Sequence, residues 1–200
     1  MKGIIIMISG KRRIIVLVLF IVIPFVSCTT KKALFLIENF EKFQPKTIAI
    51  LPIEDIHHAG KEANKLRLYI QDALKSRGYS IIEIQTTKSM LDKSNIQKYS
   101  QEKLHDIFNI ISTDAILTSK LFSYESRYRV LIERIDKVVI SFNLINRDGT
   151  SIWKDNVNKG TVRSGVGMYI DAAIFPPIQG WISDSIETLP SIAQDSPSKD

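Results

Sequence analysis

The 200-residue sequence has a single cysteine, nine glycines and seven prolines, and its mature part has no stripe of lysines and arginines. One cysteine excludes an internal disulfide. The net charge of +6 suggests an acidic partner, but Lys2, Lys11, Arg12 and Arg13 all lie in the first 27 residues. The remaining 23 basic residues (27 minus 4) face 21 acidic ones, a balance of about +2. We therefore expect no nucleic-acid partner.

The first 27 residues have the layout of a secretory signal. Basic residues come first, and an uncharged, largely apolar run follows over residues 14–27. The run is shorter than the roughly 20 apolar residues that a transmembrane helix needs. We expect residues 1–27 to be a cleaved signal peptide.

The segment Phe25-Val26-Ser27-Cys28 resembles a lipobox, in which lipid is attached to the cysteine and cleavage occurs before it. Phe25 departs from the usual leucine. Thr29 follows the cysteine, and the absence of aspartate there implies sorting to the outer membrane by resemblance to the sorting rule of diderm bacteria. We predict lipidation at Cys28 and a periplasm-facing domain. An ordinary signal peptide before an incidental cysteine, or an uncleaved anchor, stays open as an alternative.

The mature chain is predicted to begin with a tether over residues 28–45 and to continue as an α/β domain over residues 46–160. Residues 47–52 have the composition of a buried strand. Helical spacing of apolar residues follows over 61–77, with Gly78 at the expected helix end. Residues 79–85 then read as a second strand. A strand, helix and strand in this order favour a parallel pair.

The second half of the domain is predicted to be mostly antiparallel. After a polar stretch over 86–99, Leu104, Ile107, Phe108 and Ile111 form the apolar stripe of a helix. Strands are expected over 114–124, 127–134 and 136–145. Asp148-Gly149 is a hairpin signal leading to a strand over 150–157. The sequence thus predicts an α/β (α+β) fold, a mixed sheet of about five strands with helices packed on it.

The C-terminal part is predicted to be a helical segment over residues 161–190 and a disordered tail over 191–200. Pro177 is suited to the first turn of a helix, and Trp181 falls on its apolar face. That face either packs on the sheet or contacts a partner.

Residues that could carry catalysis are few. No Gly-x-Ser-x-Gly elbow and no phosphate-binding glycine loop is present. His57 and His58 lie in the loop after the first strand, near Glu54 and Asp55, but no second cluster completes a metal site. We predict no cofactor, no metal and no enzymatic activity, and treat His57, His58 and Trp181 as a possible partner surface.

Four short segments stand out together: residues 45–52, the Ser-Arg-Gly-Tyr junction at 76–79, residues 104–117, and the hairpin at 146–153. In this order they resemble a family of bacterial envelope lipoproteins of unknown function, whose best-known type is a neisserial surface lipoprotein antigen. The resemblance implies a fold similar to the N-terminal domain of the Tol system's periplasmic protein and to curli-secretion lipoproteins. It also implies a role in assemblies that cross the envelope.

The predicted function is that of an outer-membrane lipoprotein serving as a non-enzymatic accessory or scaffold in an envelope transport or secretion complex. Its partners would be the membrane, through the lipid, and envelope proteins or a second copy. A small-ligand or lipid-binding module is one alternative, and it would require a deep apolar pocket. A metal-dependent enzyme built on His57 and His58 is the other.

Overall fold

The computed structural model describes residues 31–56, 59–96, 103–130, 133–164 and 177–192. The chain divides into two compact units, residues 1–31 and residues 32–200, and all elements below belong to the second.

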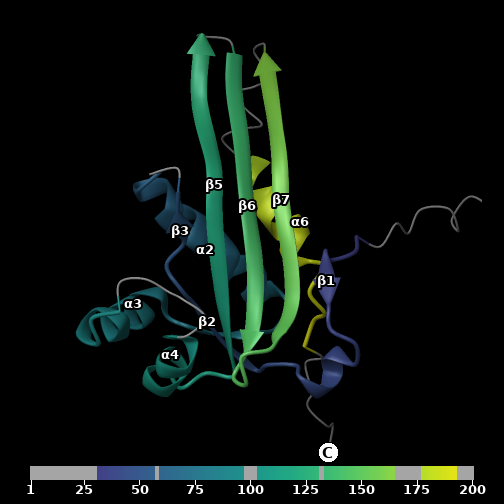
Figure 1. Cartoon of the computed structure of the whole chain (residues 1–200). Coiled ribbons are helices and arrows are strands. Elements are labelled where there is room, and N and C mark those ends of the chain that lie inside the picture. Colours follow the sequence, from purple (N-terminus) through teal and green to yellow (C-terminus); the bar gives the residue numbers. More distant parts are fainter. Residues whose placement is uncertain (1–30, 57–58, 97–102, 131–132, 165–176, 193–200) are drawn as a thin grey trace, which may run out of the picture. The chain divides into compact units, whose positions relative to one another are not determined.

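The described residues of the second unit form one mixed sheet of seven strands in the order β1-β7-β6-β5-β2-β4, with β3 paired to β5. Five strands are longer: β2 (Thr47–Ile50), β4 (Ser80–Ile82), β5 (Ala115–Val130), β6 (Glu133–Asn146) and β7 (Ser151–Ser164). Two strands have only two residues each, β1 (Phe35–Leu36) and β3 (Glu54–Asp55). This mixed sheet with helices packed on it confirms the predicted fold class (Figure 1).

The parallel part of the sheet forms as the sequence predicted. Helix α2 (Lys61–Ser76) connects β2 to β4, and the two strands pair in parallel with Ile48 beside Ile81. Strand β5 pairs in parallel with the other side of β2. The β-branched run 47–50 is fully buried except at Thr47, as expected for a strand that is covered on both faces.

Two hydrophobic cores cover opposite faces of this parallel part. On one face, α2 and α6 (Pro177–Ile186) pack on Ile48, Ile50 and Leu117. On the other face, the core joins Ala49, Leu51 and Ile116 to side chains of α3 (Ile84–Lys93) and α4 (Leu104–Ile110). Neighbouring residues of a strand point to opposite faces, so β2 and β5 supply both cores.

Strands β5, β6 and β7 continue beyond the parallel part as an antiparallel, three-stranded ribbon (Figure 1). The hairpin between β6 and β7 turns at residues 147–150, where Gly149 has φ +86°, so the predicted hairpin signal is confirmed. The prediction of a separate strand over residues 127–134 is wrong. Its first residues end β5 and its last ones begin β6, which pair with each other up to Val130 and Glu133. No glycine, proline or asparagine marks this reversal in the sequence.

The end of helix α2 has a specific hydrogen-bonding pattern. The Gly78 N–H donates to the Lys75 carbonyl, and the Tyr79 N–H donates to the Leu74 carbonyl. Gly78 has φ +89°, the left-handed conformation that this termination requires. The buried side chains of Tyr79 and Leu74 belong to the same core. The turn therefore also positions the start of β4 beside that core.

Helix α3 was not predicted from the sequence. Residues 79–85 were expected to be a strand and 86–99 a polar stretch, but β4 ends at Ile82 and the helix starts at Ile84. Ile84, Thr87 and Leu91 are its buried residues, a spacing that fits a helix face. The β-branched composition of the segment favoured a strand, whereas packing on the second core selects the helix.

Both ends of the domain reach further than expected. Phe40, in the segment expected as tether, is buried, and β1 pairs with β7. Strand β7 runs to Ser164, beyond residue 160. Residues 191 and 192 are also held against the domain, since the Ile192 N–H donates to the Arg77 carbonyl.

Tyr79 binds the same C-terminal segment. Burial raises the pKa of Tyr79 to about 12, and its protonated hydroxyl donates to the Pro190 carbonyl.

Candidate functional site: the uncovered sheet face

The most distinctive surface of the molecule is one face of the β5–β6–β7 ribbon, which we call the open face. It is the face turned away from α2 and α6, and Figure 1 shows it in front of these two helices. Among the described helices, α3 and α4 lie beside the parallel part rather than over the ribbon (Figure 1). An antiparallel sheet often has one face on the core and one toward solvent. Here the uncovered face extends along three long strands.

A cleft of about 370 Å³ lies at the base of the open face. Its floor is formed by residues of the three ribbon strands, and its wall by Pro52, Glu54 and Leu104. The polar floor residues are Thr118, Ser119, Lys120, Ser141, Asn143, Ser151 and Lys154. The lipid-binding alternative requires a deep apolar pocket, and this cleft is instead polar over most of its floor.

Within the cleft, charges and an amide are held in place. Lys120 Nζ lies 3.0 Å from Glu54 Oε1, in register with the parallel pairing of β3 and β5. Both side chains are largely exposed, so the ion pair adds little to stability. The Asn143 Oδ1 atom is buried and has no hydrogen-bond partner among the described residues. A buried acceptor left without a partner costs stability, by about 1–3 kcal/mol.

Above the cleft the open face carries two exposed large apolar side chains among polar and charged ones. Phe122 is 48% exposed and Val162 is 59% exposed. Ile135 is the direct cross-strand neighbour of Val162, and Val139 pairs with Ser123 beside Phe122. Lys120 Nζ lies 5.9 Å from the centre of the Phe122 ring. Large apolar side chains framed by polar ones are typical of surfaces that bind proteins.

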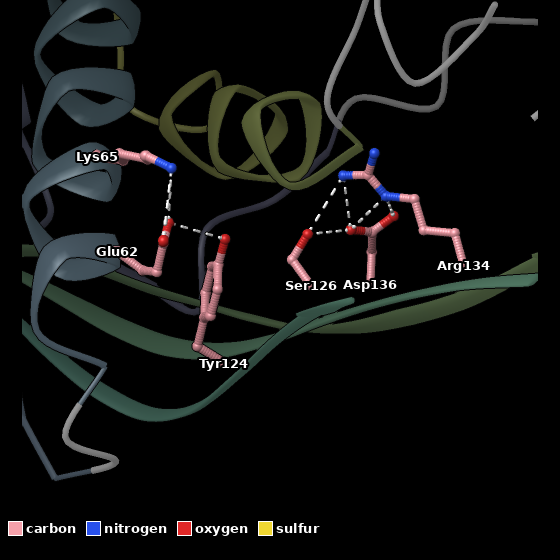
Figure 2. A network of polar contacts seen from close by, with 6 residues as sticks. All are labelled: Glu62, Lys65, Tyr124, Ser126, Arg134 and Asp136. Atoms are coloured by element: carbon pink, nitrogen blue, oxygen red, sulfur yellow. Dashed lines mark hydrogen bonds and ion pairs between the residues drawn. The ribbon is translucent and has the colours of Figure 1, made fainter. Parts of the chain in front are cut away.

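The opposite face of the ribbon carries a polar network under the helices (Figure 2). The Asp136 carboxylate is fully buried and accepts hydrogen bonds from Ser126 Oγ (2.7 Å) and from Arg134 Nε (3.0 Å to Oδ2). These side chains come from β5 and β6 and stand on the side that carries α2 and α6 (Figure 2). A buried carboxylate needs such partners because it has lost its hydration. The network therefore stabilises the ribbon internally.

The same side of the ribbon meets helix α2 through Tyr124 and Glu62 (Figure 2). Lys65 Nζ lies 3.1 Å from Glu62 Oε2, and the Tyr124 hydroxyl donates to the same oxygen at 3.5 Å. Burial, together with the negative charge of Glu62, raises the pKa of the Tyr124 phenol. The phenol therefore stays protonated and acts as a hydrogen-bond donor to Glu62.

Helix α6 is fixed to this side of the ribbon by buried aromatic and polar contacts. Trp153 is fully buried and its ring stacks on Phe142, with centroids 6.1 Å apart. Trp153 Nε1 donates to Thr188 Oγ1 at 3.0 Å, and Ser185 Oγ donates to Asp155 Oδ2 at 2.7 Å. These contacts hold α6 on the side of the ribbon opposite the open face.

The predicted site residues are not brought together on the open face. Trp181 is half-buried on α6 and packs against the core beneath that helix, on the other side of the ribbon. Cys28, His57 and His58 lie outside the described residues. His105 is exposed on α4, and it lies off the apolar stripe of that helix.

Sequence reasoning missed the open face itself. Phe122, Val139 and Val162 look like ordinary strand residues, because a face is defined only when the partners of each strand are known. One available signal was alternation in β6, where Val139, Ser141 and Asn143 share a face. In the described ranges, no three His, Cys, Asp or Glu side chains form a group able to hold a metal. None of the helices in those ranges is long and apolar enough to cross a membrane.

Comparison with known proteins gives likeness at the level of structure alone. No model of a protein family matches the sequence, and no curated protein matches it either. The structure of lipoprotein GNA1162 from Neisseria meningitidis matches with a TM-score of 0.52 at 16% identity, over 65% of this chain and 96% of that one.

Two further solved structures match more distantly. A PelC dodecamer variant from Paraburkholderia phytofirmans has a TM-score of 0.47 at 13% identity, over 74% of this chain and 90% of that one. The LpoB C-terminal domain from Escherichia coli has a TM-score of 0.40 at 12% identity, over 57% and 83%. The expected resemblance to bacterial lipoproteins is confirmed at the level of the fold, which this chain shares with lipoprotein GNA1162.

Proposed function

We propose that the chain is a lipid-anchored, non-enzymatic accessory or scaffold protein of a cell-envelope assembly, which binds a protein partner through the open face. In this proposal Cys28 carries the lipid, and the domain faces the periplasm from the outer membrane. The chain would belong to the family of envelope lipoproteins whose segments its sequence resembles. The observation that carries the proposal is the open face, a long sheet surface with apolar side chains above a polar cleft.

Several features of the open face support a protein as the partner. Its exposed apolar side chains are spread along two strands rather than gathered in a deep pocket, which suits a second macromolecular surface. The amines of Lys120 and Lys154 offer polar contacts at the base. Beyond Lys154, β7 pairs only with β6 among the described strands, so its outer edge could also accept a strand.

The proposal is tested by photo-crosslinking in intact cells, with a benzoylphenylalanine placed at Phe122 or at Val162. Leu68 on α2 is the matched control, since it is an exposed apolar residue (51%) away from the open face. We expect one envelope protein to be captured from both open-face positions and not from Leu68. Equal capture from all three positions, or capture of nothing, would overturn the proposal.

Binding of the captured protein can then be measured with the purified lipoprotein. Phe122→Ser removes the largest exposed ring of the open face and should weaken the affinity about tenfold, since a buried aromatic contact is worth roughly 1–2 kcal/mol. Leu68→Ser should leave the affinity unchanged. The predicted partner surface at His57, His58 and Trp181 is a separate proposal, and it would be supported if His57→Ser weakened binding while Phe122→Ser did not.

A further inference from the structure

The first strand of the domain and the residue before it present three consecutive large apolar side chains to solvent. Leu34 is 69% exposed, and Phe35 and Leu36 are 42% and 41% exposed. In a regular strand neighbouring side chains point to opposite faces, and one of the two is normally covered. Here β1 lies at the sheet edge, so neither side is covered fully. Leu34–Leu36 is the longest run of exposed large apolar residues in the described part of the chain.

This strand follows closely after the proposed lipid anchor. Leu34 is the sixth residue after Cys28, and an extended chain of six residue steps spans at most about 20 Å. A lipidated Cys28 lies at the level of the lipid headgroups, so the strand cannot move further than this from the membrane surface. Apolar side chains held at so short a distance face a bilayer at high effective concentration.

The charges around β1 suit a phospholipid surface. Lys154 is the cross-strand neighbour of Phe35, and its Nζ lies 5.7 Å from the centre of the Phe35 ring. Lys31 and Lys32 are exposed just before the strand. Glu38 is an exposed acidic residue just after it, so the excess of positive charge lies on the side of the anchor. Aromatic and aliphatic side chains flanked by lysine are typical of segments that lie in a membrane interface.

We propose that β1, with Leu34, Phe35 and Leu36, inserts into the membrane interface as a second attachment point beside the lipid at Cys28. The inference rests on the lipid anchor of the proposed function. A single flexible tether would let the domain turn freely, whereas a second contact fixes its orientation. Because β1 pairs with the first residues of β7, the contact holds that end of the ribbon at the membrane. Val162, eight residues beyond Lys154 along β7, is then about 27 Å from the contact.

The test uses the mature lipidated protein in vesicles of phosphatidylethanolamine and phosphatidylglycerol. Cys28 is the only natural cysteine, and its thiol is blocked by the lipid. A nitroxide label therefore attaches only to an introduced cysteine. Labels are placed at Leu34→Cys and Leu36→Cys, with Leu68→Cys and Val162→Cys as exposed controls. Collision of each label with oxygen, which partitions into bilayers, and with a water-soluble nickel complex is measured by electron paramagnetic resonance.

We expect loss of nickel collision and gain of oxygen collision at residues 34 and 36, with neither change at residues 68 and 162. Collision with nickel at residues 34 and 36 equal to that of the controls would overturn the inference. Loss of collision with both reagents would also overturn it, because it would mean that protein, such as a second copy, covers β1. If the protein does not float with the vesicles at all, the lipid anchor itself is wrong and the proposed function fails.

Discussion

At the scale of single residues, Asp114 joins two strands that are far apart in the sequence. Its Oδ2 atom accepts hydrogen bonds from the backbone N–H groups of Lys46 and Thr47 and from the Thr47 hydroxyl, at 2.8–3.0 Å. Partial burial acts to raise the pKa of this carboxyl, but the hydrogen bonds from Thr47 and Lys46 and the Lys46 charge outweigh it. The pKa of Asp114 therefore lies below its ordinary value of 3.8.

Asp114→Asn should lower the free energy of unfolding by about 1 kcal/mol at neutral pH, a value reduced because the site is exposed. A lowered pKa in the folded state means that ionised Asp114 stabilises the fold. This stabilisation is complete above the ordinary pKa and is lost as the pH falls through the folded value. Urea unfolding across pH should show the difference from wild type shrinking below about pH 4. Asp72→Asn, an exposed carboxyl on α2, should change stability by less than about 0.5 kcal/mol.

Gly78 combines a left-handed backbone with a close neighbour. A Cβ atom at this position would lie 3.1 Å from the Ile192 carbonyl oxygen, and φ is +89°. Gly78→Ala should therefore destabilise the fold by about 1–2 kcal/mol. Gly180→Ala is the control of opposite sign, because its site on α6 is open and alanine favours a helix by about 0.5–1 kcal/mol. Thermal unfolding of the two variants should show shifts in opposite directions, and equal shifts would contradict this reading.

At the scale of elements, the ribbon depends on the buried ion pair between Arg134 and Asp136. Asp136→Ala removes the fully buried carboxylate that pairs with the Arg134 guanidinium. It should lower the free energy of unfolding by about 3 kcal/mol. Glu125→Gln weakens the exposed pair between Glu125 and Arg127 on the same hairpin and should cost less than about 1 kcal/mol. Denaturant unfolding compares the two variants. Similar losses would mean that burial of the Asp136 pair has no special weight.

The elements also show where sequence patterns suffice and where they fail. Helix α2 was predictable because its apolar residues recur at helical spacing and Gly78 ends it. Helix α3 was not, because residues 80–85 have the β-branched composition of a strand, and only contact with the second core decides between the two. The reversal between β5 and β6 was missed for a similar reason. The pairing of β5 with β6 along their length determines where the chain reverses, and no typical turn residue marks that place in the sequence.

At the scale of the whole molecule, the proposed lipid at Cys28 would decide where the protein resides. Cys28→Ala should leave the protein in the soluble fraction or as an uncleaved precursor, because no acyl chain can be attached. Ser27→Ala keeps a small residue before the cleavage point and should fractionate with membranes like the wild type. Membrane fractionation with immunoblotting checks both. Unchanged outer-membrane recovery of Cys28→Ala would refute the anchor.

The sequence by itself determined the class of fold and the order of most elements, since these depend on local composition and on the periodicity of apolar residues. It also predicted an exported lipoprotein from the first 28 residues. The tertiary structure alone decided which residues stand together on the open face, that Trp181 belongs to the core side, and that β1 is exposed at the sheet edge. The physical reason is that a surface is made by strands paired across long sequence separations. Whether Phe122 or Leu34 is exposed depends on whether another element packs over it. The local sequence pattern does not determine this.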